Sequence, residues 1–175
     1  MKWACSLLRR DFMYSSTPRE VQDVMTRKVA VLHEEENLEL AEWGMKTFRF
    51  RHLPVVDGNK LVGLVSERDL LRASISSLDE AHDLRDDNLK RYFFVREVMT
   101  SEVVSVRPET SLVEAAGIMS INKLDCLPVT WEDGTLVGIL TASDFLGVAM
   151  DLLRRTGPKL AHRDASSRRD AAHTR

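Results

Sequence analysis

The feature that most constrains the fold of this chain is an internal repeat. Three motifs recur 74 or 75 positions later: DVMT at 23–26 as EVMT at 97–100, HLPVV at 52–56 as CLPVT at 126–130, and GLVSERDL at 63–70 as GILTASDF at 138–145. The offset grows by one because the second copy has one more residue in a turn, where insertions are tolerated. We therefore expect two copies of one supersecondary unit, each covering the apolar face of the other.

The first half predicts a β-α-β-β-α unit. The stretch TPRE at 17–20 resembles a capping box and predicts a helical turn. A short strand is expected near 29–32, followed by an amphipathic helix over 38–48. The apolar runs LPVV and LVGLV flank the turn DGNK and predict a hairpin, after which Ser66 begins a second helix.

The second half repeats this order of elements. It predicts a strand over 103–106, a helix capped by Ser111, a hairpin over 126–140 and a helix from Thr141. Between the halves, SLDE at 77–80 predicts the capping box of a connecting helix.

The expected fold class is α/β, in the α+β sense, with two β-α-β-β-α repeats packed with pseudo-twofold symmetry and their sheets facing at the centre. Five ranges are predicted: a partly helical N-terminal segment at 1–19, the first repeat at 20–75, a connecting helix at 76–93, the second repeat at 94–154, and a disordered basic tail at 155–175.

Composition excludes several classes of protein and site. A net charge of −2 over 175 residues gives no overall reason to bind nucleic acid. Cys5 and Cys126 form no C-x-x-C pair, which argues against a disulfide framework and a zinc site. The chain has no apolar run of the ~18 residues that a membrane span needs. We expect a cytoplasmic protein without a membrane partner.

The order of these motifs resembles a tandem pair of cystathionine-β-synthase (CBS) domains, a Bateman module of the stand-alone bacterial type. The resemblance covers most of the chain outside the N-terminal segment and the tail. It implies two clefts between the repeats that bind adenosine-containing ligands: AMP, ADP or ATP, and in some members S-adenosylmethionine or NAD. It also implies that Asp69 and Asp144 bind the ribose, while Ser66 and Thr141 lie near the phosphates.

The residues themselves allow two interpretations of this motif. An ionised aspartate can accept hydrogen bonds from both vicinal ribose hydroxyls, and the start of a helix suits a phosphate. However, Ser66-x-x-Asp69 and Thr141-x-x-Asp144 also have the spacing of capping boxes, in which each carboxylate only stabilises its own helix. The tandem architecture favours a ligand.

The remaining candidate residues lie on the first strands and before each Pro-Val. The strands would offer an apolar wall and backbone hydrogen bonds to an adenine: Val29, Ala30, Val31, Val103, Val104 and Ser105, with Pro54 and Pro128 beside them. In nucleotide-binding members of the family, basic residues two and three places before this proline contact phosphates. Arg51 and His52 match these places, and Arg68 is a further cation at a helix start; the alternative for each is a structural or surface role.

The second half has Asp125 and Cys126 where the first has Arg51 and His52. Asp125 would repel a phosphate, although Lys123 and Arg49 could compensate for its charge. Two unequal clefts are therefore predicted, one more receptive to phosphates than the other. Arg51 and His52 could serve either cleft.

No catalytic motif is present, so a non-enzymatic role is expected, with no required cofactor and an adenine nucleotide as regulatory ligand. The function predicted is a sensor module that controls an unknown protein target in trans and forms a homodimer. The alternative is a scaffold or dimerisation module without a ligand. Nucleic-acid binding through the basic tail is a more distant third interpretation.

Overall fold

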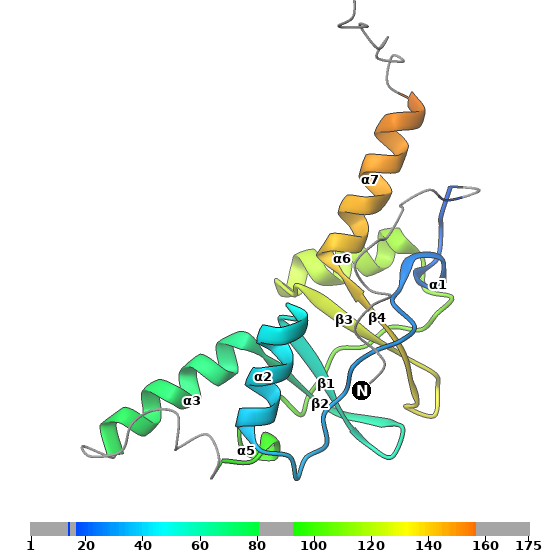
Figure 1. The fold of residues 1–175 in the computed structure, drawn as a ribbon. Coiled ribbons are helices and arrows are strands. Elements are labelled where there is room, and N and C mark those ends of the chain that lie inside the picture. The colour runs from blue at the N-terminus through cyan, green and yellow to red at the C-terminus, as the bar shows by residue number, and fades with distance from the viewer. Residues whose placement is uncertain (1–13, 15–16, 81–92, 157–175) are drawn as a thin grey trace, which may run out of the picture.

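Two antiparallel hairpins form the centre of the computed structural model, which describes residues 14, 17–80 and 93–156 (Figure 1). The elements in chain order are α1 (Val21–Val24), α2 (Leu38–Phe48), β1 (His52–Asp57), β2 (Lys60–Ser66), α3 (Glu67–Glu80), α5 (Val95–Val98), α6 (Leu112–Asn122), β3 (Cys126–Thr130), β4 (Leu136–Thr141) and α7 (Ala142–Thr156). Strand β1 pairs with β2, and β3 with β4. Both predicted hairpins are confirmed, as is the α+β fold class.

The first strand predicted for each half is reduced to a single bridge. Leu32 forms a parallel bridge with Val55, and Val106 with Val129, so each sheet has two named strands. The strands predicted near 29–32 and over 103–106 are therefore wrong in extent. Only Leu32 and Val106 of these segments are buried, and the residues before them in the same segments belong to no strand or bridge.

Two predicted helix starts are also wrong. Helix α1 begins at Val21, after the predicted turn at 17–20, because residues 19–21 pair with the second half: the amide of Val21 donates to Thr110 O at 2.9 Å. The Asp23 carboxylate accepts from the amide of Glu20 at 3.0 Å. SLDE at 77–80 begins no new helix either, since α3 runs unbroken through it to Glu80.

The two long predicted helices are confirmed. Helix α2 covers 38–48 as predicted, and helix α6 is capped by Ser111, whose Oγ accepts from the amide of Glu114 at 3.1 Å. Both helices end in the left-handed conformation, at Arg49 (φ 57°) and Lys123 (φ 54°).

The core consists of two clusters of buried apolar side chains, one around each hairpin. The cluster around β3 and β4 contains Val129 and Leu140, together with Val21 and Met25 from the α1 segment of the first half. The cluster around β1 and β2 contains Val95 of α5, from the second half. The repeats thus exchange their opening segments, and each completes the core of the other.

Isolated backbone bridges also occur in equivalent pairs, as expected for the pseudo-twofold symmetry that the repeat predicts. The bridges form three equivalent pairs: Thr26–Ile139 with Leu64–Thr100, Glu20–Ser111 with Asn37–Phe94, and Leu32–Val55 with Val106–Val129. Figure 1 shows α3 and α7 leaving the two hairpins in different directions.

The tips of the two hairpins are joined by Lys60. Its ammonium group pairs with Asp133 Oδ2 at 2.5 Å and donates to Thr135 Oγ1 at 2.9 Å. The hydrogen bond from Lys60 is the main reason that the pKa of Asp133 is lowered to about 2. Beside this pair, the amide of Leu61 donates to Gly134 O at 3.0 Å, so that backbone also links the tips.

Most of the predicted 1–19 segment, residues 81–92 of the predicted connecting helix, and the tail beyond Thr156 lie outside the described residues. The described part of the first segment, Tyr14 and 17–19, is not helical.

Candidate ligand-binding clefts

Two clefts lie between the repeats. The first cleft, of ≈ 770 Å³, is bounded by the segment around Val29, the end of α2 with the residues before β1, and the β4–α7 junction at Thr141. The second cleft, of ≈ 600 Å³, is bounded by the segment around Val103, the end of α6, and the β2–α3 junction at Ser66. Equivalent parts of the two repeats therefore build the two clefts.

The clefts share one wall. Arg51, His52 and Asp125 line both of them. Burial lowers the pKa of His52, while the negative charge of Asp125 raises it by less. His52 is therefore mainly neutral at pH 7, and Arg51 is the permanent cation of this wall. Arg51 and His52, the pair predicted to bind phosphate, thus line both clefts.

Asp69 lines the second cleft. Its Oδ2 atom accepts from the amide of Ser66 at 2.8 Å and from Ser66 Oγ at 2.6 Å, so the carboxylate caps its own helix. Its Oδ1 atom lies 3.8 Å from Arg72, and the side chain keeps 18% of its surface exposed. The geometry allows the same carboxylate to cap the helix with one oxygen and accept from a ligand with the other.

Asp144 occupies the equivalent position at the start of α7, but it lies deeper. Its Oδ2 atom accepts from the amide and the hydroxyl of Thr141, at 2.8 and 2.9 Å, and the residue is only 1% exposed. Among the described residues, Thr141 and Ser143 line the first cleft at this junction, and Asp144 does not. A ribose could contact Asp144 only after a local rearrangement.

The other residues predicted to bind the ligand divide into those that line a cleft and those that do not. Val29 and Ala30 line the first cleft; Val103, Val104 and Arg68 line the second. Among the described residues, four others line neither cleft: Pro54 and Pro128, which are fully buried in β1 and β3, Val31, and Ser105, which accepts from Thr130 Oγ1 at 3.3 Å.

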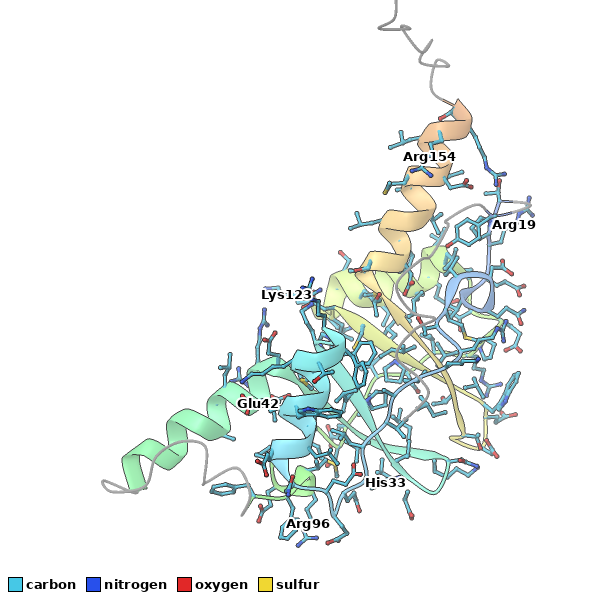
Figure 2. The ribbon with its side chains drawn as sticks, in the orientation of Figure 1. Arg19, His33, Glu42, Arg96, Lys123 and Arg154 are labelled. Atoms are coloured by element: carbon cyan, nitrogen blue, oxygen red, sulfur yellow. The ribbon has the colours of Figure 1, made fainter. Side chains whose placement is uncertain are left out.

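Several further residues line the clefts. Arg49 and Lys123 are the cations expected to compensate for Asp125, whereas sequence reasoning missed the others. Lys28, Arg49 and the Phe48–Phe50 pair, whose rings stack with centroids 5.8 Å apart, line the first cleft. Glu102 and Lys123 line the second, and Figure 2 shows Lys123 at the end of α6. The repeat itself carried a signal for them, because Lys28 and Glu102 lie 74 positions apart, as do Arg49 and Lys123.

The described residues contain no cluster of three or more His, Cys, Asp or Glu side chains that could hold a metal ion. Within the same part of the chain, no helix is long and apolar enough to cross a membrane.

Comparison with known proteins identifies the family. The model of the CBS domain matches twice, over residues 21–76 and 95–151. This chain belongs to the CBS domain family. The two CBS domains correspond to the two copies of the sequence repeat, and the two clefts lie between them.

Solved CBS-domain structures resemble this one along most of its length. A putative acetoin utilization protein (AcuB) from Vibrio cholerae is 40% identical with a TM-score of 0.66, covering 77% of this chain and 93% of that chain. CBSX2, solved in complex with AMP, is 30% identical with a TM-score of 0.66, covering 78% of this chain and all of that one.

A curated relative is a longer protein. Inosine-5'-monophosphate dehydrogenase of Korarchaeum cryptofilum is 32% identical over 140 residues, which are 80% of this chain but 26% of that enzyme. The CBS-domain chain thus spans about a quarter of that relative's length.

Proposed function

We propose that this CBS-domain pair is a regulatory module that binds an adenosine-containing ligand, with AMP, ADP or ATP as the first choice. The observation that carries the proposal is the position of Asp69, a partly exposed carboxylate at a helix start that lines a cleft between the repeats. The similarity to CBSX2, solved with AMP, supports the choice of ligand.

The residues around Asp69 suit the parts of a nucleotide. Asp69 can accept from the vicinal ribose hydroxyls, and charge-assisted hydrogen bonds of this kind are strong. Val103 and Val104 provide an apolar surface for the base, and Arg51 and Lys123 provide cations for a phosphate. A ligand would shift a partner only through a difference in its affinity for two arrangements of the repeats.

The test is a thermal-shift and calorimetry panel of the whole chain with AMP, ADP, ATP, S-adenosylmethionine and NAD. A ligand at ~100 times its Kd stabilises the folded state by about 2.7 kcal/mol. Asp69→Ala should abolish the stabilisation by the ligand that the second cleft holds. The matched control is Ser111→Ala, which also removes a helix cap but lies outside both cleft linings. No stabilisation of the wild-type chain by any of these ligands at millimolar concentration overturns the proposal.

A second candidate function, a scaffold without a ligand, is favoured by the capping geometry of both aspartates. Each accepts from its own helix start, as a purely structural residue would. In this case Asp69→Ala with Asp144→Ala would lower stability but leave self-association unchanged, with or without nucleotide. Sedimentation of wild-type and variant chains measures this. The homodimer, a target in trans and a cytoplasmic location stay predictions.

A further inference from the structure

The pseudo-twofold symmetry allows the two clefts to be compared position by position. Lys28 of the first cleft corresponds to Glu102 of the second, since both follow the same motif at an offset of 74. The left-handed residues that end α2 and α6, Arg49 and Lys123, are both cations. The two clefts therefore have the same kind of charge at one equivalent position and opposite charges at another.

The balance of charge in the linings differs accordingly. Among the described residues that line the first cleft, three cations, Lys28, Arg49 and Arg51, accompany one carboxylate, Asp125. Among those that line the second cleft, four cations accompany four carboxylates, which include Asp69 and Glu102. Clefts focus the field of the charges that line them, so an excess of one sign selects ligands of the other. The first cleft attracts anions, whereas the second is electrically balanced.

The two aspartates predicted to bind ribose also differ between the clefts. Asp69 is accessible in the second cleft, while Asp144 is buried beneath the first. The first cleft is instead lined by the aromatic pair Phe48 and Phe50, which can contact the flat face of a base. The first cleft thus holds a ligand through its phosphates and base, and the second through its ribose.

We infer that the two clefts sort adenosine ligands by charge: the first takes the nucleoside polyphosphate, and the second takes an adenosine ligand with at most one phosphate. Lys28 and Glu102 are the residues that determine this difference. The inference rests on the proposed function, because both ligands are adenosine derivatives.

The test exchanges the charges at the two equivalent positions. Calorimetry of the full chain in magnesium-free buffer measures the affinity for ATP and for adenosine, the latter being the uncharged probe. Lys28→Glu should weaken ATP roughly tenfold or more, in the range of one lost charge-assisted hydrogen bond. It should leave adenosine within about threefold and reduce the salt dependence of ATP binding. Glu102→Lys should add or strengthen a second ATP site without weakening adenosine.

Two controls match the changes in net charge. Arg154→Glu on α7 and Glu109→Lys before α6 alter charge at positions that line neither cleft (Figure 2 labels Arg154). Lys28→Gln provides a milder variant that should give an intermediate loss of ATP affinity. Tripolyphosphate should bind more weakly than ATP, because it lacks the base and the ribose.

The outcomes separate the inference from the proposed function. If neither ATP nor adenosine binds the wild-type chain, the proposed function fails, and the inference fails with it. If both bind, but Lys28→Glu acts no more strongly than Arg154→Glu, or Glu102→Lys no more strongly than Glu109→Lys, only the inference is overturned. Tighter binding of tripolyphosphate than of ATP would overturn the assignment of a nucleotide to the first cleft.

Discussion

The side chain of Met25 lies against Gly138, although the two residues belong to different copies of the repeat. A Cβ atom at 138 would be 2.6 Å from Met25 Sδ and 3.1 Å from the carbonyl oxygen of Thr26. Met99 packs in the same way on Gly63. The glycine that opens each copy of the repeated phrase therefore makes room for the methionine of the other copy.

This contact predicts the cost of adding a methyl group. Gly138→Ala should lower the free energy of unfolding by about 1–3 kcal/mol, the usual range for overpacking. Gly63→Ala should cost less, because the three atoms nearest to its added methyl group all belong to the side chain of Met99, whereas the methyl group at 138 also meets the backbone of Thr26. Urea unfolding of both variants measures the difference.

The control for these variants is Gly117→Ala. Gly117 lies within α6, and nothing is within 4 Å of its added Cβ atom. The change should raise stability by about 0.5–1 kcal/mol, since alanine favours a helix interior over glycine. Equal losses at 63, 117 and 138 would contradict the argument from close approach.

A helix cap outside the clefts should affect stability alone. Ser111→Ala removes the Oγ atom that accepts from the amide of Glu114 at 3.1 Å. The expected loss is about 1 kcal/mol, typical for an N-cap hydroxyl. Nucleotide affinity of the folded chain, measured by calorimetry, should not change. A loss of affinity as large as that of Asp69→Ala would show that helix capping, and not contact with the ligand, explains the effect at Asp69.

His52 should make stability depend on pH. Burial lowers its pKa in the folded chain below the ordinary value of 6.5. As the pH falls below about 6.5, the unfolded chain binds a proton that the folded chain still excludes, so the free energy of unfolding decreases. Urea unfolding at pH 7.5 and 5.5 should show this decrease in the wild-type chain and a smaller one in His52→Gln. The same decrease in both chains would exclude His52 as its source.

Cys126 should react slowly while the chain is folded. It is buried in β3, and burial raises the pKa of its thiol to about 12. Because the thiolate is the reactive form, three pK units above the ordinary 9.0 correspond to roughly 1,000-fold less thiolate at pH 8. In a Cys5→Ser background, a disulfide reagent should label Cys126 readily in urea and at least ~100-fold more slowly without it. Rapid labelling of the folded chain would contradict the buried position.

Local patterns were enough to predict the long helices α2 and α6 and both hairpins. The apolar spacing and end residues of 38–48 identify α2, and Asp133-Gly134 between two apolar runs identifies the β3–β4 turn. The positions of Asp69 and Ser66 beside the second cleft also followed from the repeated phrase. These features depend on residues close together in the sequence.

Features that depend on packing between the halves could not be predicted. The burial of Asp144, in contrast to Asp69, does not follow from the motif, since both copies have the same hydroxyl-x-x-Asp spacing. A strand is predicted near 29–32, yet only Leu32 forms a bridge, with Val55. No local sequence pattern indicates that α1 and α5 each pack into the core around the hairpin of the other half.

The exchange of α1 and α5 between the two cores also affects how the chain folds during translation. The hairpin of residues 52–66 leaves the ribosome early, but its apolar cluster includes Val95, which is translated about thirty residues later. Because domains generally fold as units, the first CBS domain should complete its apolar core only after Val95 has left the ribosome. A nascent chain stalled before Val95 has emerged should expose this surface to chaperones, whereas a pause later in the message should not.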